Sequence, residues 1–315
     1  MSNSMRLIVS PPVFTPSPYG LLSAVEMRDE PDQHWQMGVT FEDICGGTGT
    51  TLADCDTSAP AVTGVGMIPV KQATTSRTIY GATPFTVYSE VDCSPVDFYE
   101  NREQLMLNAL SRFESYQVER TFWTGVATDR NNTGGFANAV LPHLAANAAI
   151  NETQLGRTTI LQMAATVVTG TALNVVDALG VLEGALATCY NGAGIIHVPQ
   201  SLSPDLGLLL SRQGNRQLTP NGNVVAIGGG YPGTSPTGAA PALGTCWMYA
   251  TGAVFAYRSA PIMRLLNDPR NPPFDRNTNT VKAIIERTYV IGYDCCLFAQ
   301  LVNTSSFFGT STSTP

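Results

Sequence analysis

The amino-acid sequence predicts an α+β fold organised around one long helix. Start and stop signals for this helix agree, two strands with alternating apolar residues precede it, and shorter helices and strands follow it. Ser94 can cap the first amide groups, Pro95 suits a first helical position, and Gly125 can stop the helix. A helix between these signals is about 40 Å long at about 1.5 Å per residue, so a long and flat element must lie along it.

The expected helix has one apolar side. Apolar and aromatic residues recur at helical spacing, and charged residues such as Glu100, Arg112 and Glu119 fall mostly elsewhere. We therefore expect this stripe to lie against that flat element. Its members are Phe98, Leu105, Ala109, Phe113 and Tyr116, with Met106, Leu110 and Gln117 beside them.

The residues before the helix predict an extended arm and a protruding hairpin. Residues 1 to about 33 are rich in proline and have no core of their own. Two segments, 34–44 and 84–92, alternate as strands do, and the residues between them are mostly Gly, Thr, Ala and Asp. We expect an antiparallel hairpin with a long tip that leads into the helix. One face of the first strand holds Trp35, Met37, Val39 and Phe41, and one face of the second holds Phe85, Val87, Ser89 and Val91.

The residues after the helix alternate between helices and strands. A second helix begins after Asn174, which can cap it, and ends at Asn191 and Gly192. Small residues dominate from 228 to 245, which indicates an exposed loop. We also expect a short helix near 158–168, a helix from about 201 to 210, and strands over 194–199, 223–227, 246–259, 281–291 and 293–302.

The composition indicates a folded protein with little surface charge. Of the 315 residues, 43% are hydrophobic, which excludes wholesale disorder, and 13% are charged, about half the usual share of roughly 25%. Thr, Ser, Asn and Gly supply the polar surface instead, and they cost less to bury between subunits than unpaired charges do. The net charge of -7, with no run of arginines, argues against sequence-specific DNA binding. No segment has the pattern of a signal peptide or a membrane span, so we expect a protein made in a cytosol.

The seven cysteines show no CxxC spacing and indicate neither a zinc site nor a disulfide framework. We therefore expect buried free thiols. Cys45 and Cys55 flank a Gly/Thr loop and are candidates for a bridge formed after release from a reducing cell. Cys295 and Cys296 are adjacent and would point to opposite faces of a strand.

Catalytic motifs are weak or missing. Gly228, Gly230 and Gly233 match the spacing of a dinucleotide fingerprint, but the residues that follow cannot open the helix that a pyrophosphate requires. A mobile glycine loop is the better interpretation. The three histidines, His34, His143 and His197, have no partner nearby in sequence for metal binding or acid-base chemistry. We expect no catalytic, cofactor-binding or metal-binding residues, and hence no enzyme.

Taken in order, these features resemble the major capsid proteins of tailed bacteriophages, which have the Johnson fold that encapsulin shells share. The resemblance covers nearly the whole chain and is strongest to phages of actinobacteria. The order of the motifs, rather than any one of them, is specific. They are the strand 35–41, the strand 84–88 leading into 93–95, the segment 116–125 (YQVERTFWTG), the segment 194–199 and the strand 286–291.

The resemblance implies a division of the chain into parts. These are an N-terminal arm (1–35), an E-loop region (36–93), a peripheral domain (94–172) with a spine helix (95–123), an axial domain (173–262), and return strands with a C-terminal tail (263–315). The loop over 228–245 would approach the five-fold and six-fold axes.

The resemblance also implies a function. Copies of the chain would form hexamers and pentamers of an icosahedral shell around double-stranded DNA, in a virion assembled in the host cytoplasm. Implied partners are further copies, a separate scaffolding protein, portal and decoration proteins, and packaged DNA by non-specific proximity, but no membrane. Lys71 lies where some shells of this family form a covalent cross-link. The alternatives are an encapsulin-like compartment and, from another class, a cytosolic α/β nucleotide-binding enzyme.

Overall fold

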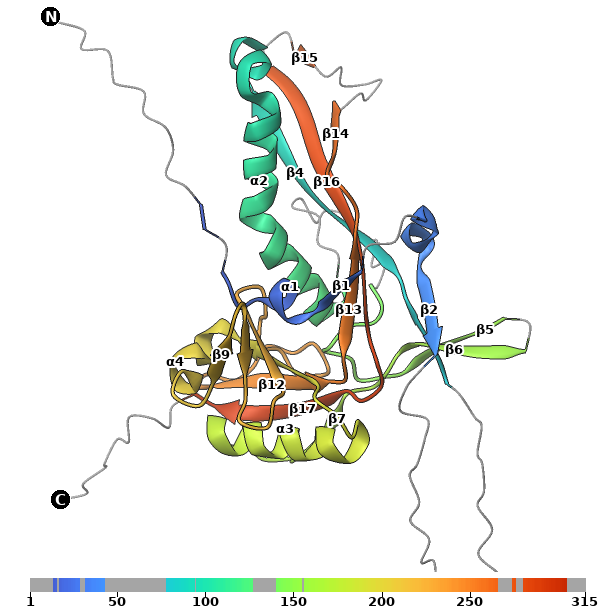
Figure 1. Ribbon diagram of the computed structural model, residues 1–315, viewed down its shortest axis with the longest axis vertical. Helices are drawn as coiled ribbons and strands as arrows, with labels where there is room; N and C mark the ends of the chain where they lie inside the picture. The colour runs from blue at the N-terminus through green and yellow to red at the C-terminus, as the bar shows by residue number, and fades with distance from the viewer. Residues whose placement is uncertain are drawn as a thin grey trace, which may run out of the picture.

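A long helix and two long strands lie side by side and form the upper part of the protein in Figure 1. The computed structural model describes residues 14–15, 17–28, 32–42, 78–93, 95–126, 140–154, 156–265, 274–275 and 280–304. The helix α2 runs over Pro95–Thr124, and the strands β4 (Pro84–Cys93) and β16 (Thr280–Tyr293) pair antiparallel along it. The expected long helix and the flat element beside it are thus confirmed.

The pair β4–β16 belongs to a six-stranded sheet. The main path of this sheet is β1-β13-β16-β14, with β4 and β15 also paired to β16. Its remaining strands are β1 (Glu26–Arg28), β13 (Val254–Arg258), β14 (Ile262–Leu265) and β15 (Phe274–Asp275). The strand β1 follows the short helix α1 (Leu21–Ala24), so the N-terminal segment is tied to the same sheet.

A seven-stranded sheet forms the lower part, and α3 (Val175–Cys189) packs on it (Figure 1). Asn174 caps α3 by accepting from the Asp177 amide at 2.9 Å, and Asn191 adopts the left-handed conformation that ends the segment. The strand order is β7-β17-β12-β8-β11-β10-β9. The strands are β7 (Thr166–Val167), β8 (Ile195–Pro199), β9 (Ser211–Gln213), β10 (Arg216–Leu218), β11 (Val224–Gly228), β12 (Thr245–Thr251) and β17 (Phe298–Asn303).

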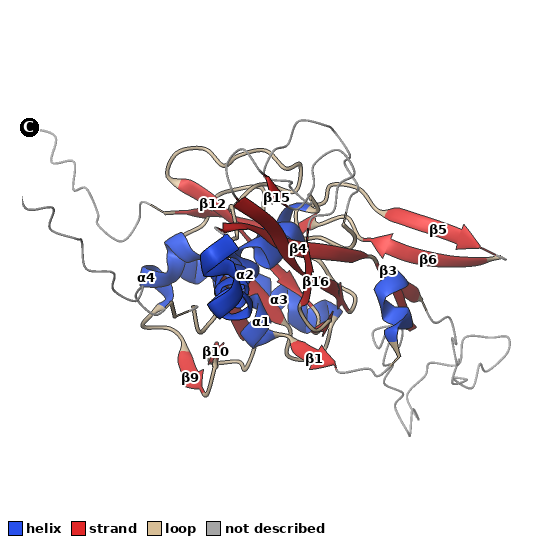
Figure 2. Ribbon diagram, turned by 90° about the horizontal axis from the view of Figure 1, so that it is seen from above, coloured by secondary structure: helices blue, strands red, loops and turns tan. Residues whose placement is uncertain are grey.

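A four-stranded sheet, β2-β3-β6-β5, lies at the side, and β5 and β6 project from the molecule (Figures 1 and 2). The pair β2 (Val39–Glu42) and β3 (Ile79–Ala82) is antiparallel and brackets residues 43–77. The expected pairing of 34–44 with 84–92 was wrong, because β2 pairs with β3 and β4 pairs with β16. Lys71, Cys45 and Cys55 lie outside the described residues. The strands β5 and β6 span Ile150–Gln154 and Arg157–Gln162.

Several expected element boundaries were wrong. Residues 34–37 belong to the 3-10 helix η1 (Gln33–Met37), and Gly38, with φ of +111°, turns the chain into β2. Residues 158–168 form β6 and β7 instead of a helix. The helix expected over 201–210 is shorter and consists of η2 (Gln200–Leu202) and α4 (Ser203–Leu206).

The side of α2 that faces the sheet differs from the expected stripe. Met106 and Leu110, expected beside the stripe, are buried at 0% and 2% exposure, whereas Leu105, Phe113 and Tyr116 are 47%, 55% and 43% exposed. The hydrophobic pattern contains two adjacent apolar rows, and periodicity alone cannot say which row meets the sheet. Near its end the helix is enclosed, because Val118, Phe122 and Trp123 are all buried.

The expectation of free thiols was wrong for at least three cysteines. Cys189 at the end of α3 forms a disulfide with Cys296, and Cys295 is also disulfide-bonded. Cys295 and Cys296 lie in the connection between β16 and β17 rather than on a strand. Cys246 is a buried free thiol, as expected, and burial raises its pKa to about 12.

Truncating one leucine from each apolar row of α2 tests which row supports the fold. Leu110→Ala should lower the free energy of unfolding by about 2–5 kcal/mol, because it removes buried apolar volume. Leu105→Ala on the exposed side should change it by less than about 0.5 kcal/mol. Urea unfolding followed by circular dichroism measures both, and equal effects would contradict the assignment of the buried side.

Candidate assembly surfaces and the joint around Glu119

The carboxylate of Glu119 lies where the N-terminal segment, the long helix and the glycine loop meet. Its side chain projects from α2 and the residue is only 3% exposed. Oε1 accepts a hydrogen bond from the Leu21 amide at 3.1 Å, and Oε2 accepts one from the Gly230 amide at 2.9 Å. Burial raises the pKa of Glu119, and the backbone donors, which include Gly229, oppose this shift. One side chain thus joins segments that lie 98 and 111 residues away in sequence.

Glycine permits the close approach at this joint. A Cβ atom on Gly230 would collide with the carbonyl oxygen of Tyr116, and one on Gly20 would collide with Oε1 of Glu119. Gly230 therefore requires glycine for its backbone to reach the helix, and a Cβ atom at Gly20 would displace the Glu119 carboxylate. The joint depends on backbone contact rather than on side-chain packing alone.

The glycine loop is packed at its base against the end of α2. Tyr231 is 5% exposed, and its ring centroid lies 4.9 Å from that of Trp123. The indole Nε1 of Trp123 donates to Thr234 Oγ1 at 2.9 Å, and the Tyr249 hydroxyl donates to the Thr234 carbonyl at 3.0 Å. No helix follows β11 within residues 229–244, so the loop presents no helix N-terminus to a phosphate.

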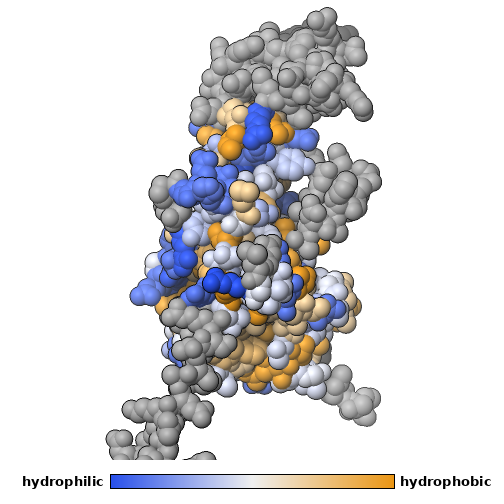
Figure 3. Space-filling view, turned by 90° about the vertical axis from the view of Figure 1, so that its right-hand side faces the viewer, coloured by the Kyte–Doolittle hydropathy of each residue, from blue (hydrophilic) through white to orange (hydrophobic). Residues whose placement is uncertain are grey.

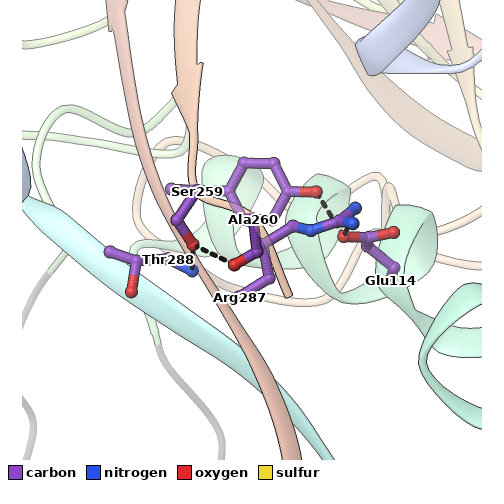
Figure 4. A network of polar contacts seen from close by, with 6 residues as sticks. Glu114, Ser259, Ala260, Arg287 and Thr288 are labelled. Atoms are coloured by element: carbon purple, nitrogen blue, oxygen red, sulfur yellow. Dashed lines mark hydrogen bonds and ion pairs between the residues drawn. The ribbon is translucent and has the colours of Figure 1, made fainter. Parts of the chain in front are cut away.

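A second polar joint ties the C-terminal half of α2 to β16 (Figure 4). The Glu114 carboxylate accepts from Arg287 Nη1 at 2.7 Å and from the Tyr289 hydroxyl at 2.5 Å. The Glu114 and Arg287 side chains are 12% and 15% exposed, so neither charge has much access to water. Ser259 accepts from the Thr288 amide at 2.9 Å and holds the chain beyond β13 to the same strand. Removing Glu114 or Arg287 would leave the other charge buried without its partner.

The three histidines are separated in the structure and do not form one site. His34 is exposed and pairs with Asp32 at 2.5 Å. His143 lies beside the end of α2, and burial lowers its pKa. His197 on β8 is fully buried between the Tyr231 hydroxyl at 3.2 Å and Thr251 Oγ1 at 3.0 Å, and burial lowers its pKa to about 3. Over the described part of the chain, no group of three His, Cys, Asp or Glu residues could hold a metal ion.

Large apolar side chains are exposed at one end of the seven-stranded sheet. Leu208 follows α4 and is 93% exposed, and Leu243 precedes β12 and is 106% exposed. Leu243 lies just before the start of β12, which pairs with the end of β17, and α4 lies beside this end of the sheet in Figure 1. Apolar side chains also gather on the lower part of the face seen in Figure 3. Hydrophilic residues lie mainly above them on the same face. Among the described helices, none combines the length and apolarity of a membrane-spanning segment.

Sequence patterns single out Gly230 of the joint but not Gly20, Glu119 or the pair Glu114–Arg287. Glu119 falls among the charges outside the expected apolar stripe, and Arg287 lies on the strand expected over 286–291. The signal available in the sequence was a carboxylate placed between the apolar residues Val118 and Phe122. The structure buries both of these residues. Its partners could not be found, because they lie about a hundred residues away.

The geometry defines a class of fold, the α+β fold of phage capsid proteins. Solved structures with this fold match nearly the whole chain, whereas no protein-family profile and no curated protein sequence matches it. The capsid of an empty GTA particle matches with a TM-score of 0.51 and 12% identity over 96% of this chain and 94% of that chain.

Structures from two mycobacterial phages are similar to the same extent. A chain of Mycobacterium phage Adephagia matches with a TM-score of 0.51 and 10% identity over 95% of this chain and 94% of that one. A chain of Mycobacterium phage Ogopogo matches with a TM-score of 0.50 and 11% identity over 95% and 96%. The resemblance to tailed-phage capsid proteins that the sequence indicated is confirmed at the level of the fold.

Removing the Glu119 carboxylate should loosen the joint. Glu119→Ala leaves the amides of Leu21 and Gly230 buried without acceptors, so the free energy of unfolding should fall by about 3 kcal/mol. Hydrogen exchange should accelerate at these two amides before it does in β16. Glu90→Ala, an exposed change on β4, serves as the control. Unchanged exchange at Leu21 and Gly230 would contradict the role given to Glu119.

His197 should make the fold sensitive to acid. Its pKa is depressed in the folded state, so its contribution to stability is present above the unfolded value near 6.5 and is lost as pH falls toward 3. Between pH 7 and 5 the loss should be about 2 kcal/mol, at about 1.4 kcal/mol per unit. Urea unfolding of the wild type and of His197→Gln at both pH values measures it. The variant should show a flatter dependence, and identical slopes would refute the assignment.

Proposed function

We propose that this protein is the major capsid protein of a tailed phage. Copies would join as hexamers and pentamers into an icosahedral shell around double-stranded DNA. The observation that carries the proposal is the shared fold over 96% of this chain and 94% of a GTA particle capsid chain. That capsid was described with five-fold symmetry, which is the symmetry of a pentamer in a closed shell.

The proposed parts of the subunit keep their expected boundaries. The arm (1–35) would include α1 and β1, the E-loop region (36–93) would include the β2–β3 pair, and α2 would be the spine helix of the peripheral domain (94–172). The axial domain (173–262) would include α3 and most of the seven-stranded sheet, and residues 263–315 would return through β16 and β17. The three separate sheets and the joint at Glu119 support this division.

The exposed leucines support the placement of one end of the axial domain at the symmetry axes. Leu208 and Leu243 are nearly fully exposed and lie at the same end of the sheet. Burying such a side chain contributes about 1.5–3 kcal/mol, and a ring of copies would bury several together. The loop that contains Leu243 is also the one expected near the axes from the sequence.

The low charge supports a wall that encloses DNA without gripping it. At a net charge of -7, the subunit would contact the packaged DNA by proximity rather than by sequence readout. Scaffolding, portal and decoration proteins would complete the virion. A cross-link through Lys71 remains a prediction, as that residue lies outside the described part.

The two alternative functions predict different properties of the protein. An encapsulin-like compartment would form shells that load a protein cargo instead of DNA. A nucleotide-binding enzyme would need space at Gly228–Gly233, but Tyr116 and Tyr231 closely approach Gly230 and Gly228 there. The packed loop therefore favours the shell protein over the enzyme.

Assembly of the purified chain tests the proposal. Sedimentation velocity and negative-stain microscopy should show hexamers, pentamers or closed shells. The double variant Leu208→Asp, Leu243→Asp should remain monomeric with an unchanged melting temperature, because both side chains are exposed. The control is Ala187→Asp, a change at an exposed position near the C-terminal end of α3. This variant should still assemble. A wild-type chain that stays monomeric at high concentration would contradict the function.

A further inference from the structure

One side of α2 carries an apolar stripe that the described elements leave about half exposed. We name Leu105, Phe113 and Tyr116 the outer stripe; they are 47%, 55% and 43% exposed. Their spacing of eight and three residues places them on one face of the helix, over a length of about 17 Å. The adjacent row of the helix, with Met106 and Leu110, is the one that is buried in the core. Side chains of this size on three turns of a helix exceed the scattered exposure normal for a surface.

Over residues 104–120, the described part of α2 that carries the outer stripe, the exposed charges have one sign. Arg112 and Arg120 are exposed near the stripe, and neither makes an ion pair within the described ranges of the chain. The two carboxylates of this stretch, Glu114 and Glu119, are turned inward and engaged in the joints. The outer face of α2 from residue 104 to 120 is therefore apolar and basic on a chain whose net charge is -7.

We propose that the outer stripe binds an amphipathic helix of a second protein, with acidic residues flanking its apolar side. A helix laid along α2 would place its apolar side chains on the stripe, and its carboxylates could pair with Arg112 and Arg120. Nucleic acid would engage the arginines but would leave the three apolar side chains uncovered. Pairing of α2 with α2 of another copy would bring the arginines of two molecules together, which is unfavourable.

This contact goes beyond the self-assembly proposed above. The outer stripe is on α2, whereas Leu208 and Leu243 lie at the end of the seven-stranded sheet. A variant can thus lose one contact and keep the other, so the two proposals can fail separately.

Two designed peptides test the proposal on the full-length chain. Each is a fluorescein-labelled helix of about 20 residues with leucines along one face, flanked by glutamates in one peptide and by lysines in the other. Fluorescence anisotropy should show at least about tenfold tighter binding of the acidic peptide. Phe113→Ser should weaken that binding by about tenfold or more, because it removes a central apolar anchor. The double variant Arg112→Glu, Arg120→Glu should reverse the preference toward the lysine peptide.

Control measurements separate binding from folding and from the other occupants. Val176→Ser, an exposed change on α3, should leave peptide binding unchanged, and circular dichroism should show every variant folded. Equal binding of both peptides, or no effect of Phe113→Ser, would overturn the proposal. A short DNA duplex that binds through the two arginines but is insensitive to Phe113→Ser would assign the surface to nucleic acid instead. Loss of shell assembly in Phe113→Ser would assign it to a second copy and would equally overturn the proposal.

Discussion

The packing of α2 along β4 and β16 is the contact on which the rest of the structure depends. Most of the stability of a helix in a protein comes from the burial of one of its sides. Met106, Leu110 and the enclosed end at Phe122 and Trp123 supply that burial. The strand β16 in turn pairs with β4, β13, β14 and β15, so the helix is coupled to the whole six-stranded sheet.

Two buried carboxylates of α2 fix what the apolar contacts leave undetermined. Apolar packing permits a helix to slide or rotate, whereas hydrogen bonds to a buried charge have a defined geometry. Glu114 fixes the helix on Arg287 and Tyr289 of β16, and Glu119 fixes it on the N-terminal segment and the glycine loop. The lower sheet and the upper sheet are thereby held to one rigid element.

The sequence was sufficient for elements whose signals are local. The long helix, the cap at Asn174 and the buried strand at 195–199 follow from residue patterns within a few positions. The same reasoning failed where one residue pattern fits two kinds of secondary structure. Trp35 and Met37 alternate as in a strand but lie in a 3-10 helix. It also failed where the partner was distant, as for Glu119 and for the Cys189–Cys296 disulfide, because no local pattern encodes which segments meet.

The disulfide between Cys189 and Cys296 closes a ring of backbone that contains β8 to β16. The exposed tip near Leu243 lies within this ring, in a place open to proteases. A single cut there would leave the two pieces covalently tethered, with the strands on either side still paired to their neighbours. Backbone cleavage and loss of the subunit are therefore separate events for this protein as long as the bridge is oxidised.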